Sequence, residues 1–203
     1  DFEKRTLDEK TAARSPFAQF EMWLNEAIAE KIDDPNAMTL ATATSGGRPS
    51  ARVVLLRGYD AKGFVFFTNY ESQKGAEIEE NPQASLLFFW PRMERQARID
   101  GAIGKTSRRV STAYFATRPR ESQIGAWASA QSSVIASRAE LEERIAALER
   151  KFAGRPVPCP DFWGGYLLKP LTFEFWQVPK SRLHDRLLYT KINRGWRIER
   201  LSP

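Results

Sequence analysis

Residues 50–69 read SARVVLLRGYDAKGFVFFTN and contain two β-like runs separated by a short polar segment. The first run, Ala51–Arg57, and the second, Phe64–Asn69, are rich in β-branched and aromatic residues, which favour strands. The intervening Asp60-Ala61-Lys62-Gly63 is typical of a turn, because aspartate and glycine adopt turn conformations easily. The stretch therefore predicts a β-hairpin.

Further β-like runs on both sides of this hairpin indicate a sheet of many strands. Gly, Pro, Asn or Asp residues bound these runs, and Gly46-Gly47 predicts a second hairpin turn. The longest run, Arg95–Lys105, is expected to bend at Gly101 or Gly104. The other predicted strands are Met38–Thr44, Ala84–Trp90, Tyr166–Leu168, Thr172–Val178, Arg186–Thr190 and Trp196–Leu201.

Three segments show helical character. Phe17–Ile28 and Ala139–Phe152 carry apolar residues at helical spacing, and Ser107–Thr117 ends just before a proline. Ser137 and Glu140 form the S-x-x-E capping box that starts the predicted helix Ala139–Phe152. Many short strands with a few helices predict a mainly β protein with packed helices, of the α+β class, built as a small barrel with helices outside.

The composition is that of an ordinary globular protein. The chain has 203 residues, of which 42% are hydrophobic and 28% are charged. Residues 1–14 are polar and are predicted to form a mobile N-terminal arm, and residues 15–203 are predicted to form a single domain. Cys159 is the one cysteine of the chain, which rules out an internal disulfide and fits a reducing cytoplasm.

The net charge of +6 is compatible with phosphorylated small molecules, nucleic acids or anionic membranes as partners. The basic residues are scattered along the chain, whereas a nucleic-acid footprint clusters on one face. No stretch is long and apolar enough to span a bilayer, and the N-terminal residues lack the apolar segment of a signal peptide. We therefore expect neither nucleic acid nor a membrane as a partner.

Several common catalytic motifs are missing from the sequence. No G-x-G-x-x-G follows a predicted strand, and neither G-x-S-x-G nor H-E-x-x-H occurs. Gly104-Lys105-Thr106 resembles the end of a phosphate-binding loop, but Ile99 occupies the position of the required first glycine. Because His184 is the single histidine, a multi-histidine metal centre is excluded and no metal is expected.

Two strand-associated clusters of basic residues are candidate anion sites. Arg182, His184 and Arg186 alternate, so an extended chain would place them on one face, where they could hold an anionic ligand. An exposed polar strand end would have the same pattern. Arg52 and Arg57 flank an apolar run with opposite parity, so they could face two different anions or simply mark the solvated ends of a strand.

Two helix-associated patterns are also compatible with phosphate binding. Ser72 is a plausible N-cap, and Lys74 in the first turn would add positive charge to the helix N-terminus. Tyr114 and Arg118 are four residues apart on a predicted helix, with Ser122 soon after, and could form a second phosphate pocket. Equally, Tyr114 could be a core residue and Arg118 a cation at a helix end.

Several segments, by their residues and by their order along the chain, resemble the pyridoxine/pyridoxamine 5′-phosphate oxidase family. The resemblance extends from about residue 17 to the end of the chain, and RPRESQIGAW and RLHDR are its most specific parts. The resembling segments are RPSARVVLLRGYD, GFVFFTNYESQKG, NPQASLLFFWPRMERQARIDG, YFATRPRESQIGAWASAQSSVI, FWGGY, FEFWQVPKSRLHDRLLY and GWRIERLSP.

The resemblance implies an FMN-binding split β-barrel that forms a homodimer, with FMN bound at the subunit interface. The residues implied in FMN binding are Arg52, Val53, Val54, Leu55, Leu56, Arg57, Phe67, Thr68, Gln73, Lys74, Gln96, Gln131, Ser132, Trp176 and Arg186. Those implied in substrate binding are Arg57, Tyr114, Arg118, Ser122, Arg182, Leu183 and His184. Arg182 and His184 are the implied catalytic residues, and we expect them to position the substrate's pyridine ring and reacting carbon.

Three positions depart from the family pattern. Arg57 stands where the family usually has lysine, which exchanges a point charge for a planar fork. Phe67 stands where tyrosine is common and cannot donate a side-chain hydrogen bond, and Gln73 replaces an arginine beside the FMN phosphate. We therefore expect weaker FMN binding than in relatives that carry both residues. The N-terminal Arg/Tyr pair that often covers the substrate has no clear match.

The resemblance implies the oxidation of pyridoxine 5′-phosphate or pyridoxamine 5′-phosphate to pyridoxal 5′-phosphate, a step of vitamin B6 metabolism in which O2 is reduced to H2O2. One alternative is a related FMN oxidase that acts on another substrate, such as a phenazine precursor. A second is a non-catalytic flavin- or vitamer-binding protein, and a third, less favoured, is a basic nucleic-acid-binding barrel. Tyr114, Arg118 and Ser122 favour a phosphorylated pyridine as the substrate.

Overall fold

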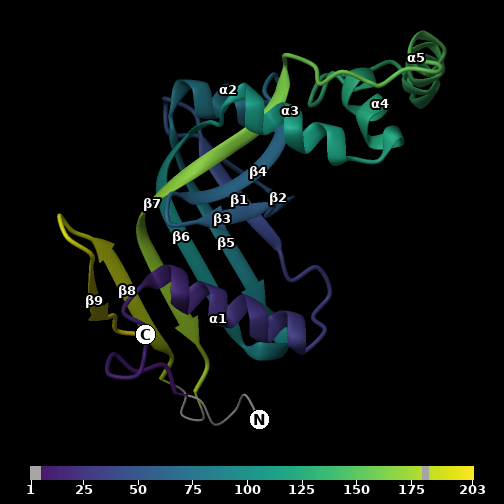
Figure 1. Ribbon diagram of the computed structural model, residues 1–203. Helices are drawn as coiled ribbons and strands as arrows, with labels where there is room; N and C mark the ends of the chain where they lie inside the picture. Colours follow the sequence, from purple (N-terminus) through teal and green to yellow (C-terminus); the bar gives the residue numbers. More distant parts are fainter. Residues whose placement is uncertain (1–5, 180–182) are drawn as a thin grey trace.

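The computed structural model describes residues 6–179 and 183–203. Within these residues, nine strands form one antiparallel sheet (Figure 1). The strands are β1 (Ala37–Ala43), β2 (Pro49–Leu55), β3 (Gly58–Asp60), β4 (Gly63–Asn69), β5 (Gln83–Trp90), β6 (Arg95–Lys105), β7 (Trp163–Gln177), β8 (Asp185–Lys191) and β9 (Trp196–Arg200). The helices are α1 (Pro16–Ala29), α2 (Gln73–Glu80), α3 (Arg108–Thr117), α4 (Arg120–Ala128) and α5 (Arg138–Lys151), with a 3₁₀ turn, η2, over Pro91–Met93. None of these described helices has the length and apolar character needed to cross a membrane.

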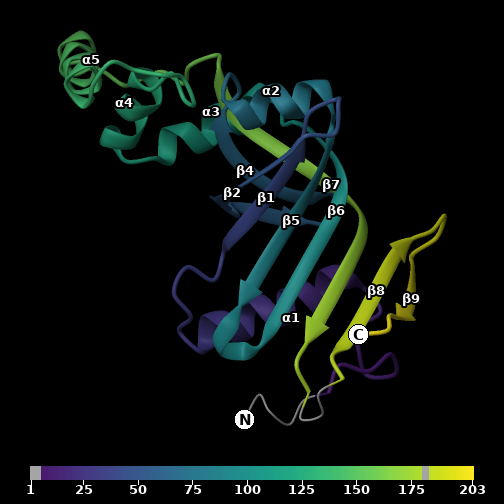
Figure 2. The ribbon, with the colours of Figure 1, turned by 180° about the vertical axis from the view of Figure 1, so that it is seen from behind.

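The sheet follows the order β2-β1-β5-β6-β7-β4-β3, and β8 and β9 continue from β7. The first part of β7, residues 163–168, pairs with β4, whereas the second part, residues 172–177, pairs with β8. Opposite the junction of these two parts, the pairing of β6 with β7 shifts register between Asp100 and Gly101. A Cβ atom on Gly101 would lie 2.1 Å from the carbonyl oxygen of Lys169, so the close approach requires glycine. The sheet is therefore curled, as the view from behind shows (Figure 2).

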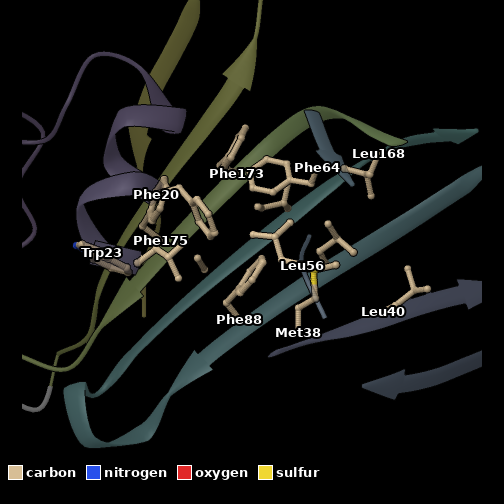
Figure 3. Close-up of a cluster of buried hydrophobic side chains, with 14 of the residues drawn as sticks. Phe20, Trp23, Met38, Leu40, Leu56, Phe64, Phe88, Leu168, Phe173 and Phe175 are labelled. Atoms are coloured by element: carbon tan, nitrogen blue, oxygen red, sulfur yellow. The ribbon is translucent and has the colours of Figure 1, made fainter. Parts of the chain in front are cut away.

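Aromatic side chains fill the inside of the curled sheet (Figure 3). Helix α1 lies across one end of the sheet and buries Phe20 and Trp23 against it. The ring centroid of Phe20 lies 5.0 Å from that of Phe64 and 4.8 Å from that of Phe88. Phe173 on β7 packs 5.8 Å from Phe64. Edge-to-face contacts of this kind join the helix and both halves of the sheet into one core.

A second, smaller apolar cluster joins α3, α4 and α5 to the beginning of β7. Its buried members are Phe115, Ile124, Phe152, Val157 and Trp163. Both views show these helices extending from the end of the sheet that is opposite β8 and β9 (Figures 1 and 2). The start of β7 therefore lies between the main core and the helical extension.

The prediction of a mainly β protein with packed helices is confirmed. The expected bend in β6 occurs at Gly101. The division of residues 166–178 into two strands is wrong, because β7 continues through Pro170. Proline cannot donate to the ladder of hydrogen bonds, but it is tolerated at irregular positions, and Pro170 pairs with Gly101 at the register shift.

Two elements, α4 and β3, lie where no element was predicted. Pro119 was interpreted as a helix stop, and α3 does end before it, but the same proline is the N-cap of α4. The sequence of α4, RESQIGAWA, contains a glycine and shows little apolar periodicity, so it gives a weak helix signal. Strand β3 has three residues, which is too short for a periodic pattern. The predicted turn at residues 60–63 is present, but it joins β3 to β4; the predicted pairing of the run 51–57 with the run 64–69 is wrong, because β2 pairs with β1 across the Gly46-Gly47 turn.

Residues 6–14, the described part of the predicted N-terminal arm, lie against the C-terminal strands. Leu7 is buried, with 4% of its surface exposed. The hydroxyl of Tyr189 on β8 donates a 2.9 Å hydrogen bond to the carbonyl oxygen of Ala13. The mobility of the arm and the single-domain organisation stay predictions.

Candidate functional site

A cavity of about 340 Å³ lies between β4, the start of β7 and helices α3 and α4. Its wall includes four residues predicted to bind the substrate phosphate, which are Arg57, Tyr114, Arg118 and Ser122. The other lining residues are Phe67, Thr68, Asn69, Gly125, Ala126, Ser129, Gln131 and Trp163. No acidic side chain occurs among these described lining residues, so two guanidiniums give the cavity a net positive charge. Such a cavity favours an anionic ligand.

Arg118 is the C-cap residue of α3 and supplies one of these guanidiniums. Its guanidinium carbon lies 4.6 Å from the ring centroid of Trp163, in a cation–π contact. Burial lowers the pKa of Arg118 from its ordinary value, and the charge of Arg57 acts in the same direction. Among the described residues, the buried Nη1 atom of Arg118 has no hydrogen-bond partner. Because an unsatisfied buried donor is costly, this atom is suited to an anionic oxygen of a ligand.

One wall of the cavity is a stack of three aromatic rings from separate elements. The ring centroid of Phe67 on β4 lies 3.9 Å from that of Tyr114 on α3, with 17° between the ring planes. The ring centroid of Phe67 also lies 5.6 Å from that of Trp163 on β7, with 13° between the ring planes. The Phe67 side chain carries no hydrogen-bonding group, so its ring is held in this stack by packing. The cavity therefore combines flat apolar surface with guanidinium groups.

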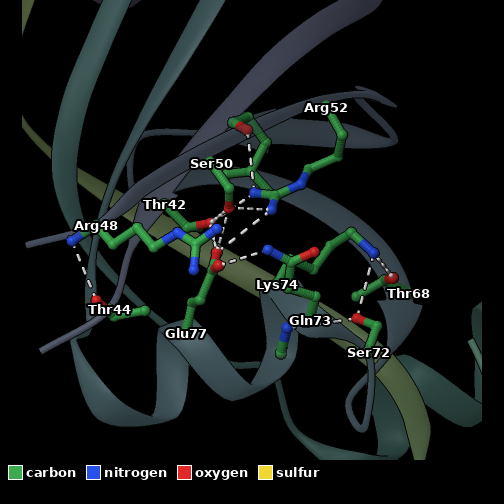
Figure 4. A network of polar contacts seen from close by, with 12 residues as sticks. Thr42, Thr44, Arg48, Ser50, Arg52, Thr68, Ser72, Gln73, Lys74 and Glu77 are labelled. Carbon is green, nitrogen blue, oxygen red and sulfur yellow. Dashed lines mark hydrogen bonds and ion pairs between the residues drawn. The ribbon is translucent and has the colours of Figure 1, made fainter. Parts of the chain in front are cut away.

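A second polar cluster lies where α2 packs against β1 and β2 (Figure 4). Glu77 on α2 is buried and accepts hydrogen bonds from Thr42, from Ser50 at 2.6 Å and from Arg52 at 3.3 Å. Burial by itself raises the pKa of Glu77, but these hydrogen bonds and one from Gln73 outweigh it and bring the pKa to about 2. Glu77 is therefore ionised and holds the guanidinium of Arg52 in place.

Lys74, in the first turn of α2, connects this cluster to the cavity. Its Nζ donates hydrogen bonds to Gln131 at 2.9 Å, Ser72 at 3.2 Å and Thr68 at 3.3 Å, and both Gln131 and Thr68 also line the cavity. Burial lowers the pKa of Lys74 to about 8, and the charge of Arg52 contributes in the same direction. The charge of Glu77 opposes these two effects only in part, and the direct hydrogen-bond partners of the ammonium are all neutral oxygens. A phosphate group fits between Lys74 and Arg52 on these chemical grounds.

A third group of predicted residues lies at the other end of β7. Gln96, Trp176 and Arg186 are paired in one row across β6, β7 and β8, so their side chains share a face of the sheet. His184 lies directly before β8 and packs its ring 4.9 Å from that of Trp176. Arg186 donates to Glu174 through Nε at 2.9 Å. The structure brings these residues together, but none of them lines the 340 Å³ cavity.

The length of β7 separates this third group from the cavity. Trp163 forms part of the cavity wall, and Trp176, which contacts His184, is 13 residues further along the same strand. At ~3.3 Å per residue, that spacing corresponds to about 40 Å along the strand. A single small ligand can contact both groups only if they come from different copies of the chain.

The remaining predicted residues lie on β2 and in two connecting segments. Val53–Leu56 runs from an exposed valine near the end of β2 to a leucine in the core. Ser132 has a positive φ of 72° in the segment that follows Gln131. Leu183 is 70% exposed. Arg182 lies outside the described residues. The functional roles of all these side chains stay predictions.

Glu77 and Trp163 belong to the site but are absent from the residues predicted from the sequence. Glu77 could have been found from its position four residues after Gln73, which places both on one face of α2. Trp163 lies within the FWGGY segment, but only the fold brings its ring against Phe67. The predicted N-cap role of Ser72 is confirmed by the hydrogen bond that its side chain accepts from the backbone N–H of Gly75.

Comparison with known proteins identifies two regions of family similarity. Residues 24–151 match the profile described as pyridoxamine 5′-phosphate oxidase, and residues 163–203 match that of the pyridoxine 5′-phosphate oxidase C-terminal dimerisation region. A pyridoxine/pyridoxamine 5′-phosphate oxidase of Rubrobacter xylanophilus is 56% identical over 203 residues, which cover 100% of this chain and 94% of that protein. The enzyme of the same name from Burkholderia cenocepacia is 56% identical over 206 residues, covering 100% of this chain and 96% of that protein.

Solved structures confirm the predicted split-barrel class. PhzG from Burkholderia lata, in complex with tetrahydrophenazine-1-carboxylic acid, superposes with a TM-score of 0.93 at 30% identity and covers 100% of both chains. A pyridoxamine 5′-phosphate oxidase-related FMN binding protein from Nostoc punctiforme gives a TM-score of 0.72 at 17% identity, covering 91% of this chain and 97% of that one. At that identity the second likeness concerns the fold alone.

Proposed function

Because the chain belongs to the pyridoxamine 5′-phosphate oxidase family, we propose that it is an FMN-dependent oxidase that forms pyridoxal 5′-phosphate. Its substrates are pyridoxine 5′-phosphate or pyridoxamine 5′-phosphate, and O2 is the electron acceptor and yields H2O2. Full-length relatives that are named for both vitamers and are 56% identical support this assignment. The cytoplasmic location stays a prediction from the sequence.

The observation that carries the proposal is a pair of cationic clusters with shared neighbours. Arg52 and Lys74 form one cluster, and Arg57 and Arg118 form the other. Thr68 and Gln131 bond to Lys74 and also line the cavity that contains Arg57 and Arg118. Two adjacent cationic clusters suit a reaction between two phosphorylated molecules, one a cofactor and the other a substrate.

FMN fits the first cluster by the chemistry of its phosphate. Arg52 and Lys74 would hold that phosphate, with Gln131 and Thr68 as neutral neighbours. When bound, FMN supplies an acceptor for the hydride that leaves the substrate and passes the electrons to oxygen. The protein's own contribution is to bind both molecules and to align the reacting carbon.

The second cluster is assigned to the substrate phosphate. Arg118 offers its unpartnered Nη1 from between the aromatic rings, and Arg57, Tyr114 and Ser122 offer further donors. A guanidinium binds phosphate oxygens through two parallel N–H groups, which fixes direction as well as position. The stacked rings of Phe67, Tyr114 and Trp163 limit the volume that is available to the pyridine ring of the ligand.

A homodimer completes the site in this proposal. His184, Trp176 and Gln96 lie about 40 Å along the strand from the cavity of their own chain, at ~3.3 Å per residue. In the dimer, these residues of each chain therefore act on the ligand that is bound in the cavity of the other chain. The match of residues 163–203 to a dimerisation region supports this arrangement. His184 and Arg182 position the substrate ring, since transfer of a hydride to flavin does not require a strong base.

The likeness to PhzG raises a phenazine precursor as an alternative substrate, because it covers the whole chain. Its identity of 30% is well below the 56% shared with the vitamer oxidases. The paired arginines of the cavity also favour a phosphate over a carboxylate, since a phosphate offers more acceptor oxygens.

The proposal is tested by loading the purified protein with FMN and measuring peroxide release. We expect turnover with pyridoxine 5′-phosphate and pyridoxamine 5′-phosphate, and little with unphosphorylated pyridoxine. Arg118→Met should lower kcat/KM for the phosphorylated vitamers about 100-fold or more, because a buried charge-assisted contact is lost. Equal activity on pyridoxine and its phosphate would contradict the assignment of the cavity. A protein that binds FMN but oxidises no vitamer would support a binding role.

A further inference from the structure

Arg200, the last residue of β9, joins three separate parts of the chain. Its Nε and Nη2 each donate a 2.8 Å hydrogen bond to the carboxylate of Glu9, in a two-pronged pair. Its Nη1 donates to Asp185 at 2.7 Å, and Nη2 also donates to the carbonyl oxygen of Leu7 at 3.1 Å. One guanidinium thus contacts the N-terminal segment and the first residue of β8.

The contacts of Leu7 close this arrangement into a loop. The backbone N–H of Leu7 donates to the second carboxylate oxygen of Asp185 at 3.4 Å, while its carbonyl accepts from Arg200. The side chain of Leu7 is buried, with 4% of its surface exposed. Residues 6–9, which we call the strap, are therefore anchored both by polar contacts and by an apolar side chain.

The strap is anchored at the segment that carries predicted site residues. Asp185 lies directly between His184 and Arg186. The end of the chain adds two contacts to the same segment, because the backbone N–H of Leu201 donates to the carbonyl of Arg186 and Nη1 of Arg186 donates to the carbonyl of Ser202. The start of β8 is thus restrained from the N-terminal and the C-terminal sides of the chain together.

We propose that Arg200 is a positioning residue, which clamps the strap onto Asp185 and so fixes His184 for the substrate. This inference rests on the proposed function, since it assumes that His184 faces the substrate. Among the described residues, the side chain of Arg200 bonds to the strap and to Asp185 and does not line the cavity, so it would act on His184 through Asp185 and the strap.

The geometry requires arginine at this position. Three nitrogen atoms of one planar group reach three acceptors that lie in different directions, and a lysine ammonium cannot span them. The hydrogen bonds from Arg200 bring the pKa of Glu9 to about 2, so the clamp stays charged throughout any practical assay range. The Arg200 and Glu9 side chains are each 38% exposed, and salt should therefore weaken the clamp.

The test compares Arg200→Met, Arg200→Lys and Glu9→Gln with a matched control on the same strand. Arg197→Met removes an exposed ion pair between Arg197 and Glu199 that touches neither the strap nor Asp185. Each variant, loaded with FMN, is assayed for KM and kcat with pyridoxine 5′-phosphate. The dissociation constant for FMN and the rate of trypsin cleavage after Lys10 are measured alongside.

We expect Arg200→Met to raise KM about five- to tenfold, with kcat and the FMN dissociation constant within about twofold of wild type, as for the loss of several partly exposed charge contacts. Cleavage after Lys10 should accelerate in parallel, because an unclamped strap opens more often. Arg200→Lys should not restore either value, Glu9→Gln should show a smaller change of the same kind, and Arg197→Met should match wild type.

Unchanged KM in Arg200→Met, or faster cleavage without a rise in KM, would overturn the positioning role. Equal losses in kcat, KM and FMN affinity, with a lower melting temperature, would also overturn it and indicate general destabilisation. If Arg200→Met does not fold, Glu9→Gln carries the same test. A wild-type protein that oxidises no vitamer would instead refute the proposed function, and the cleavage assay would still report on the clamp.

Discussion

The buried ammonium of Lys74 predicts that FMN affinity depends steeply on pH. Burial, aided by the charge of Arg52, brings the pKa of Lys74 to about 8 in the cofactor-free protein, from an ordinary value of 10.5. A phosphate beside Lys74 would favour the charged form and raise this pKa again. Binding of FMN above pH 8 therefore requires the uptake of a proton, which makes the apparent affinity fall as pH rises.

The size of the effect follows from the pKa. With a pKa of about 8, roughly 90% of Lys74 is charged at pH 7 and roughly 10% at pH 9. The apparent dissociation constant for FMN should therefore rise about tenfold between pH 7 and pH 9. The phosphate has its second pKa near ~6 and stays a dianion over this range, so its own titration adds little.

The assay is the quenching of flavin fluorescence when FMN is titrated into the cofactor-free protein at several pH values. Lys74→Met should weaken binding at pH 7 and remove the slope, whereas Lys62→Met, in the exposed β3–β4 turn, should retain it. Riboflavin lacks the phosphate and should bind weakly with no comparable slope. A wild-type dissociation constant that is flat from pH 7 to pH 9, or a slope that persists in Lys74→Met, would refute the reasoning.

Three further predictions concern the same helix. Glu77→Gln should lower the free energy of unfolding by about 3 kcal/mol at pH 7, as measured by urea unfolding. The pKa of Glu77 in the folded protein, about 2, lies below the ordinary value of 4.5. The stabilisation by ionised Glu77 is therefore fully present above pH 4.5 and should vanish as the pH falls toward 2. Gly75→Ala should lower stability by about 1–3 kcal/mol, because its Cβ would lie 1.9 Å from the carbonyl oxygen of Tyr70, whereas Gly104→Ala, with no described atom within 4 Å, should leave the melting temperature nearly unchanged. Gln73→Arg should tighten FMN binding about three- to tenfold without affecting riboflavin, and an unchanged FMN constant would show that residue 73 does not face the phosphate.

Local sequence patterns were sufficient to predict most of the strands of the sheet and the N-terminal caps of two helices. The capping signals at Ser72 and Ser137 depend on neighbours within one turn, and the structure contains both caps. The continuity of β7 through Pro170 could not be predicted in this way, because it depends on the register shift opposite, at Gly101. The sequence of β6 predicted a bend at this glycine, but the pairing of Gly101 with Pro170 is a property of two strands together, which the sequence of either strand alone does not reveal.

In the candidate site, too, local patterns predicted neighbours along the chain but not contacts between distant elements. Alternation predicted that His184 and Arg186 would lie together, and helical spacing predicted the approach of Tyr114 and Arg118. Neither pattern contains the ring of Trp163, which comes from a distant strand to support the Arg118 guanidinium. The engagement of Arg186 with Glu174 likewise depends on strand pairing rather than on sequence distance.

The proposed division of the site between the two ends of β7 would link cofactor binding to assembly of the dimer. The proposed phosphate-binding groups Lys74 and Arg118 lie near one end, and Trp176 and His184 lie at the other. Strand β7 bends where its pairing with β6 shifts register, but its path of about 40 Å, at ~3.3 Å per residue, still keeps its two ends too far apart for one flavin to reach both within a single chain. Any ligand that touches both groups must therefore bridge two chains, and it stabilises the dimer by binding to that form alone. The clamp of Arg200 acts on the far end of this arrangement, so an intrachain contact in one subunit would tune the geometry of the site used by its partner.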